Sequence, residues 1–266
     1  FNPIIVHLQD KEKIYDFAKA NDSAKKLIEH FMPGPLTLIL PIVKNSNISK
    51  LVTAGLDTIA LRVPSDEVAH NILSEFKNPI AAPSANISGK PSSTRSEDAL
   101  KTFNGLVSCI IKNKNSKIGL ESTVISFENE SPILLRLGGL EIEKIQKVLN
   151  RKILYKNKPK KTLKVSSPGL TLKHYAPKAI LRLNAKTALK DEIFMGFGKL
   201  PKSTIGKTLS ENENLNEAAF NFYSHLIYLD QLCETLNKKR IAVSNIPNIG
   251  LGKTINDRLK RGAKNN

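Results

Sequence analysis

The sequence is poor in cysteine and contains no tryptophan. It has two Cys, at positions 109 and 233, among 266 residues. Neither belongs to a CxxC pair or to a spacing typical of zinc ligands, and both stand among apolar neighbours. This pattern excludes a disulfide framework and a cysteine-based zinc centre, and it predicts two reduced, buried thiols.

Long hydrophobic runs are also absent. The longest, residues 36–43, is interrupted by Thr37 and Pro41 and falls far short of the roughly 20 residues that a membrane-spanning helix needs. The first residues carry no initiator Met and no basic, apolar and small-residue succession of a secretory signal. We therefore expect a soluble, cytoplasmic protein that binds no membrane, and a beginning that is missing from this sequence.

Acidic residues are scarce beside basic ones. The chain has 41 Lys and Arg against 24 Asp and Glu, a formal charge of +17, but only eight of the basic residues are Arg. Net charge indicates nonspecific attraction to polyanions rather than fold or specificity. A basic surface for nucleic acid and a lysine-rich compositional bias both explain the excess, so Arg is the more informative residue here.

Hydrophobic periodicity alternates between helical and extended patterns, which predicts an α/β fold. Helices are predicted at 11–20, 22–31 (capped by Asp22 or Ser23), 65–76, 96–103, 140–149, 215–236 and 253–264. Strands are predicted at 36–42, 58–63, 79–82, 106–112, 122–127, 133–137 and 241–245. Residues 156–178 lose all periodicity, as a linker does. We therefore predict a domain at 1–150, a linker at 151–178 and a small α/β domain at 179–266.

Several catalytic motifs are absent or incomplete. Gly250 to Thr254 resembles the end of a phosphate-binding P-loop, but Pro247 stands where the full motif requires Gly, so a tight strand-to-helix turn is favoured. No HExxH, G-x-S-x-G or clustered metal ligands occur. Zinc hydrolysis and acyl-enzyme chemistry therefore have no basis in the sequence.

The first half of the chain carries the informative polar residues. Residues 82–94 form a loop with many small hydroxyl and amide residues, which offers neutral donors and close backbone approach to an anionic ligand, although an ordinary Ser/Asn turn has the same composition. Arg62 and Arg136 each end an apolar strand. A buried guanidinium needs a carboxylate or a phosphate, so each Arg either binds such a ligand or pairs with a structural Glu.

Ten short sequence blocks along the chain resemble those of the YrdC-like threonylcarbamoyl-AMP synthases, in their two-domain variety. The matching blocks occur in the family's order: NPIIVH (2–7), MPGPLT (32–37), LRVP (61–64), APSANISG (82–89), GLESTV (119–124) and LRLG (135–138), then SPG (167–169), HYAP (174–177), GLG (250–252) and DRL (257–259). Six ordered blocks in the first half are far more specific than any one of them, and the resemblance covers nearly the whole chain.

The resemblance implies a twisted mixed-sheet YrdC-like domain followed by a small Rossmann-like α/β domain. It implies an enzyme, a nucleotidyltransferase that joins L-threonine, bicarbonate and ATP into threonylcarbamoyl-AMP for tRNA modification, and releases pyrophosphate. It assigns no nucleophile and no protein metal site, with Mg²⁺ entering on the ATP phosphates. It places threonine at His7, Arg62, Ser84 and Ser122, and ATP at Thr58, Asn86, Thr94, Arg136 and Tyr175.

The chain departs from the family at its start. Members carry a Pro-Thr-Glu-Thr-x-Tyr-Gly-Leu segment and a Lys-x-Arg pair upstream of the first block, and this sequence begins after them, so we expect residues 1–266 alone to synthesise the adenylate weakly or not at all. The alternative function is a noncatalytic binding protein for structured RNA such as tRNA, which the charge supports. Carbamoyl transfer as in hydrogenase maturation is disfavoured because its accompanying modules are absent.

Overall fold

The computed structural model describes residues 3–44, 46–112, 116–128, 130–155 and 176–263. The chain forms two compact units: unit 1 comprises residues 1–83 and 121–170, and unit 2 comprises residues 84–120 and 171–266. The segment 84–120 thus groups with the second unit, whereas the predicted first domain contained it. The linker, with Tyr175, falls largely outside the described residues.

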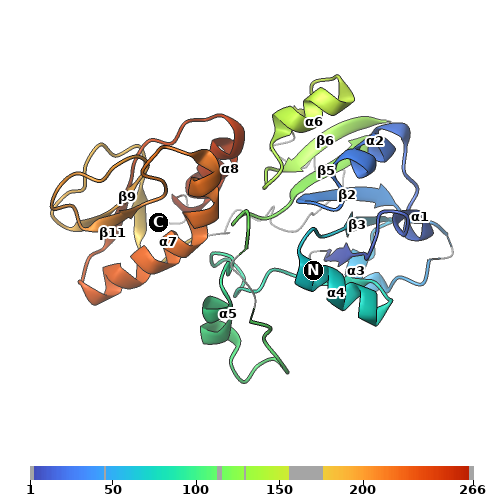
Figure 1. Ribbon diagram of the computed structural model, residues 1–266, viewed down its shortest axis with the longest axis horizontal. Coiled ribbons are helices and arrows are strands. Elements are labelled where there is room, and N and C mark those ends of the chain that lie inside the picture. Colours follow the sequence, from blue (N-terminus) through green and yellow to red (C-terminus); the bar gives the residue numbers. More distant parts are fainter. Residues whose placement is uncertain (1–2, 45, 113–115, 129, 156–175, 264–266) are drawn as a thin grey trace. The chain divides into compact units, whose positions relative to one another are not determined.

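Unit 1 is built on a mixed sheet of the order β4-β1-β3-β2-β5-β6-β7, with parallel and antiparallel neighbours. Figure 1 shows its central strands side by side. The strands are β1 (Ile5–His7), β2 (Leu36–Pro41), β3 (Thr58–Arg62), β4 (Ile80–Ala81), β5 (Thr123–Glu128), β6 (Ser131–Arg136) and β7 (Leu154–Tyr155). The helices are α1 (Ile14–Phe17), α2 (Asp22–Phe31), α3 (Lys50–Thr53), α4 (Glu67–Phe76) and α6 (Ile142–Leu149).

The core of unit 1 follows the strand period of two. Leu36, Leu38 and Leu40 point to one face of β2, where they pack with apolar residues of α2 and α6, while Ile39 joins a smaller buried cluster. Both faces of β2 are buried, which explains why its sequence is almost continuously apolar. Helix α2 matches its predicted range, but its cap is Asn21, whose side chain accepts a hydrogen bond from the Ala24 N–H at 2.8 Å.

Strand directions bring several chain segments to one edge of this sheet. The strands β1 and β3 are parallel and end together, with His7 in register with Arg62. The strand β2 runs antiparallel to β3 and parallel to β5, so its first residues lie at the same edge. Since β6 is antiparallel to β5, its last residue, Arg136, also arrives there. The functional residues described below are built on this edge.

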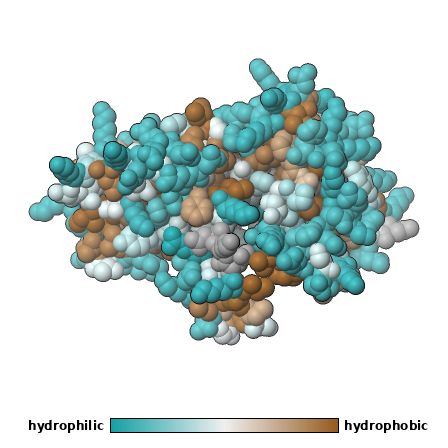
Figure 2. Space-filling view, viewed as in Figure 1, coloured by the Kyte–Doolittle hydropathy of each residue, from teal (hydrophilic) through white to brown (hydrophobic). Residues whose placement is uncertain are grey.

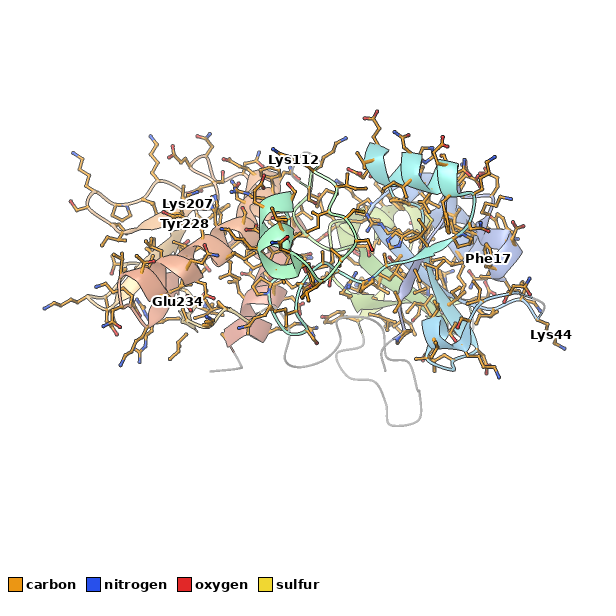
Figure 3. The ribbon with its side chains drawn as sticks, turned by 90° about the horizontal axis from the view of Figure 1, so that it is seen from below. Phe17, Lys44, Lys112, Lys207, Tyr228 and Glu234 are labelled. Carbon is orange, nitrogen blue, oxygen red and sulfur yellow. The ribbon has the colours of Figure 1, made fainter. Side chains whose placement is uncertain are left out.

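Unit 2 contains a wholly parallel sheet of the order β10-β9-β11-β8. Its elements are α5 (Ser96–Phe103), β8 (Ile180–Arg182), β9 (Glu192–Gly196), β10 (Gly206–Thr208), α7 (Leu215–Thr235), β11 (Arg240–Val243) and α8 (Gly250–Ala263). The long helix α7 packs its apolar side chains onto the strands, and Lys207 of β10 lies 4.9 Å from the ring centre of Tyr228 on α7 (Figure 3). This is the predicted Rossmann-like α/β architecture.

The structure corrects three local predictions. Residues 106–112 form no strand; Leu106 is 76% exposed and Ile111 is 52% exposed, and apolar side chains gather on the surface around α5 (Figure 2). Cys109 is consequently exposed rather than buried, whereas Cys233 is buried as predicted. The helix predicted at 11–20 is reduced to α1, because the backbone is extended at Ala18, which forms an isolated antiparallel bridge with Ile42.

The P-loop-like sequence lies inside a helix. Helix α8 begins at Gly250, so Lys253 and Thr254 belong to its first turns and Thr254 is buried. Gly252 is required there because a Cβ would lie 2.0 Å from the Pro247 carbonyl oxygen. The segment therefore forms the first turns of α8, whereas the strand-to-helix connection expected there lies before it, at residues 244–249. Among the described residues, no helix is both long and apolar enough to cross a membrane.

Candidate functional site

Arg136 and Ser122 form the most closely connected pair at the sheet edge. Arg136 is 5% exposed, and it donates from Nε and Nη2 to the Ser122 carbonyl oxygen at 3.1 and 2.9 Å. Nη2 also donates to the Ser122 hydroxyl at 3.0 Å. That hydroxyl lies 2.7 Å from the hydroxyl of Thr37 on β2. The guanidinium is thus fixed in direction by three contacts with one residue.

The position of Ser122 is set by the turn that follows β6. The Gly139 N–H donates to the Glu121 carbonyl oxygen at 2.7 Å, and the Thr123 hydroxyl donates to the Leu140 carbonyl oxygen at 2.6 Å. Gly138 allows this close packing, because a Cβ there would lie 2.3 Å from the backbone of Ser122 and Thr123. The Gly-Gly sequence after Leu137 therefore holds the serine against Arg136.

Arg62 adds a second guanidinium to the same edge. Its Nε donates to the Gly34 carbonyl oxygen at 3.2 Å, in the loop before β2. Burial, and then the positive charge of Arg136, lower the pKa of Arg62 to about 10, and Asp66 opposes this shift. Among the described residues, no carboxylate lies within ion-pair distance of Arg62. Arg62 and Arg136 are neighbouring cations, and Arg62 has no ion-pair partner among the described residues. Together they create a site for an anion.

His7 lies beside Arg62 as a neutral ring. Burial first, and then the charge of Arg62, lower the pKa of His7 to about 4, against a smaller opposing effect from the Ile80 and Ile5 backbone. Its Nδ1 is buried and has no hydrogen-bond partner in the described part of the chain. A buried polar atom without a partner costs free energy, which a ligand can recover. At neutral pH the ring therefore contributes hydrogen bonding rather than charge.

Thr58, the predicted ATP residue of β3, lies apart from this cluster. It is the first residue of the strand, in register with Pro41, while Arg62 is the last. Four strand steps separate the two residues by about 13 Å. The structure therefore brings together His7, Arg62, Ser122 and Arg136, but it leaves Thr58 at the opposite edge of the sheet.

The segment of residues 84–94 carries the predicted Ser84, Asn86 and Thr94. Asn86 donates from Nδ2 to the Ile87 and Lys90 carbonyl oxygens, both at 2.9 Å, which closes the loop on itself. The Asn86 Oδ1 and the Thr94 hydroxyl are buried and have no partner within the described residues. Ser84 is exposed. The loop therefore holds two buried polar atoms that have no partner among the described residues.

The loop of residues 84–94 belongs to a segment that packs against α7. Gly119 has a φ of +72°, and a Cβ there would lie 2.4 Å from the Ala219 carbonyl oxygen of that helix. Leu120 packs against the core of unit 2. Farther along α7, His225 is buried, and burial, Lys207 and, to a smaller extent, Arg95 lower its pKa to about 4. Unit 2 thus holds the end of the segment at Gly119 and Leu120.

Comparison with known families shows which family the chain belongs to. A model of the Sua5, YciO and YrdC proteins, described as "Telomere recombination", matches residues 1–138. The chain belongs to the Sua5/YciO/YrdC family. A second model, described as "Threonylcarbamoyl-AMP synthase, C-terminal domain", matches residues 140–264.

Curated relatives of this Sua5/YciO/YrdC chain include two proteins named threonylcarbamoyl-AMP synthase. That of Pyrococcus abyssi is 42% identical over 180 residues, 67% of this chain and 52% of the relative. That of Bacillus subtilis is 42% identical over 183 residues, 68% of this chain and 53% of the relative. The chain therefore spans about half the length of the curated relatives that it matches.

A solved structure extends the similarity across both units. The crystal structure of Pyrococcus abyssi Sua5 complexed with L-threonine is 31% identical, with a TM-score of 0.86. The alignment covers 99% of this chain and 80% of that one. The fold of a Sua5-type protein, a YrdC-like domain followed by a second α/β domain, is therefore present throughout this member of the family.

Sequence reasoning missed two contributors to the cluster in this Sua5/YciO/YrdC chain. Thr37 is fully buried, and the only signal for it is a hydroxyl residue in an otherwise apolar strand. The Gly34 carbonyl, which orients Arg62, is a backbone group and leaves no signal beyond the Pro-Gly-Pro turn. Among the described residues, no group of three or more His, Cys, Asp or Glu is placed to hold a metal ion.

Proposed function

We propose that this protein synthesises threonylcarbamoyl-AMP from L-threonine, bicarbonate and ATP, and releases pyrophosphate. The observation that carries the proposal is the anion site of unit 1, in which Arg62 has no ion-pair partner within the described residues and lies beside Arg136 and a neutral His7. The relative solved with L-threonine has the same fold over both units, which supports an amino-acid substrate.

The threonine carboxylate would bind Arg62. A guanidinium presents its donors in a planar fork that matches a carboxylate, and the Nε contact with Gly34 leaves the Nη groups of Arg62 for that purpose. The neutral ring of His7 can accept a hydrogen bond from a polar N–H or O–H of the same substrate. Ser122 and, from the segment 84–94, Ser84 would supply the hydroxyl contacts that the family resemblance implies.

The chemistry requires positioning more than a protein nucleophile. The threonine amine and bicarbonate form a carbamate and water, and a carbamate oxygen then attacks the α-phosphorus of ATP. The bond from that phosphorus to the bridging oxygen breaks, and pyrophosphate leaves. Charge accumulates on the phosphate oxygens, so a fixed guanidinium such as that of Arg136 lowers the barrier.

The family resemblance assigns ATP to Arg136, Asn86 and Thr94. The Asn86 Oδ1 and the Thr94 hydroxyl are buried and have no partner among the described residues, as groups that await a ligand would be. Thr58 and Tyr175 complete the set that the resemblance implies. Arginine and neutral donors suit phosphates and offer few ligands to a divalent ion, so a Mg²⁺ ion would enter on the triphosphate and supply further charge neutralisation there. The product would serve tRNA modification in the cytoplasm, with tRNA or its modification complex as the partner.

The experiment measures pyrophosphate release by the protein as the cell makes it, with ATP and Mg²⁺ present. We expect release only when L-threonine and bicarbonate are both supplied, and a product whose mass is that of threonylcarbamoyl-AMP. Arg136→Ala should lower the rate about 100-fold or more, because it removes the fixed charge near the phosphate. Arg151, which is exposed in the same unit, provides the control variant Arg151→Ala.

Two outcomes would contradict the proposal. Release that ignores threonine would indicate ATP hydrolysis instead of synthesis. Salt-sensitive tRNA binding in a protein that binds no threonine would favour the noncatalytic RNA-binding function, to which the charge of +17 also points.

A further inference from the structure

A cavity of about 410 Å³ lies within unit 2, away from every residue assigned above. It opens at the carboxyl ends of β8 and β11, two neighbouring parallel strands. Ligands of open parallel sheets bind outside the carboxyl ends of the strands, and cavities of 300 to 1,000 Å³ are the usual size for small-molecule sites. Position and size therefore agree with a ligand site.

Backbone contacts fix the walls of this cavity. The Ala185 N–H donates to the Val243 carbonyl oxygen at 2.8 Å, which ties the chain after β8 to β11. The Ser244 N–H donates to the Met195 carbonyl oxygen at 2.9 Å, which ties the chain after β11 to β9. Asn184, between these contacts, has a φ of +55°, a conformation that Asn tolerates better than most residues. The polar side chains that line the cavity are therefore carried by backbone that these hydrogen bonds already hold in place.

The polar lining is made of amides, one hydroxyl and one cation, with no carboxylate among the lining residues. Asn256 donates from Nδ2 to the Ile246 carbonyl oxygen at 3.0 Å, which turns its own carbonyl oxygen toward other partners. Ser244 Oγ is buried and has no hydrogen-bond partner in the described part of the chain. Lys260, one turn beyond Asn256 on α8, has no ion-pair partner among the described residues.

These groups indicate one class of ligand. Lys260 favours an anionic group, the amides of Asn184 and Asn256 can both donate and accept hydrogen bonds, and Leu183 and Leu259 provide an apolar wall for a flat ring. We propose that this cavity binds a mononucleotide, with the phosphate at Lys260 and the base against the apolar wall. Rotation of the Ser244 hydroxyl would then provide its missing partner.

The experiment titrates AMP and, separately, inorganic phosphate into the full chain by calorimetry. All variants carry Arg136→Ala, so that the nucleotide site proposed above contributes little. On that background the test variants are Lys260→Gln and Lys260→Glu, and the control is Lys202→Gln, another exposed lysine of unit 2. Because Lys260 is exposed, its replacement should leave the melting temperature unchanged, which a thermal melt verifies.

We expect AMP to bind the Arg136→Ala protein, about tenfold more weakly after Lys260→Gln and still more weakly after Lys260→Glu, with no change after Lys202→Gln. Equal AMP affinity in the Lys260 and Lys202 variants would overturn the proposal, and so would the absence of AMP binding in the Arg136→Ala protein. Phosphate binding as tight as AMP binding would overturn the nucleotide assignment. None of these readouts depends on pyrophosphate release, so they are independent of the proposed synthase activity.

Discussion

Replacement of Arg62 by alanine should separate ligand binding from stability. A bidentate contact between guanidinium and carboxylate contributes about 3 kcal/mol when the group is mostly buried, which corresponds to about a 100-fold weaker dissociation constant after its loss. The stability of the fold should not decrease by a comparable amount. Arg62 lies beside the positive charge of Arg136 and has no carboxylate at ion-pair distance among the described residues, so its removal relieves a repulsion that offsets the lost hydrogen bond to the Gly34 carbonyl oxygen.

The assay is calorimetric titration of L-threonine into the wild-type chain and its variants, with a thermal melt of each. Arg62→Ala should raise the dissociation constant about 100-fold while the melting temperature stays the same or rises. Arg62→Lys should fall between, because it keeps the charge but loses the planar fork. Arg151→Ala, at an exposed position of unit 1, is the matched control. Unchanged affinity in Arg62→Ala, or a melting temperature lowered by many degrees, would refute the reasoning and make Arg62 a structural residue.

Three further predictions concern stability and reactivity. Gly138→Ala should destabilise unit 1 and weaken threonine binding, because the new Cβ would lie 2.3 Å from the Ser122 backbone. Denaturant titration measures the loss of stability, and a variant as stable as the wild type would mean that the turn accommodates a Cβ without cost. An alkylating reagent should label Cys109 in the native protein but Cys233 only after unfolding, because burial raises the pKa of the Cys233 thiol to about 11. Mass spectrometry of the labelled peptides measures this, and equal labelling of the two thiols in the native protein would contradict the prediction. The pKa of His7 falls from 6.5 to about 4 on folding, so only the unfolded state binds a proton between these values, and stability should decrease as pH falls through this range, by up to about 3 kcal/mol. The variant His7→Gln should lose less stability between pH 7 and 4.5, and an identical pH dependence would contradict the assignment.

The sequence predicted most of the elements, because local signals and core contacts agreed. Helices α2 and α5 have their predicted ranges, and most strands are within two residues of theirs. The strand predicted at 106–112 was wrong because its apolar residues find no partner strand, which periodicity alone does not reveal. Cys109 was misplaced for the same reason.

The candidate site was predictable only in part. Ordered motifs identified His7, Arg62, Ser122 and Arg136, and the parallel and antiparallel pairing of their strands explains why they meet. The predicted strand at 58–63 already put Thr58 and Arg62 at opposite ends, but the sequence could not show which end meets the other functional residues, because that depends on the pairing of β3 with β1 and β2. The packing of residues 84–120 against α7 depends on backbone contacts distant in sequence, which composition does not encode.

The most direct test of the account compares the binding of L-threonine with that of its methyl ester to the wild-type chain. The ester keeps the amine and the hydroxyl but has no carboxylate charge for the anion site of unit 1. L-threonine should bind at least about 100-fold more tightly than the ester. Equal binding of the two compounds would contradict the claim that this sheet edge recognises the carboxylate of an amino acid.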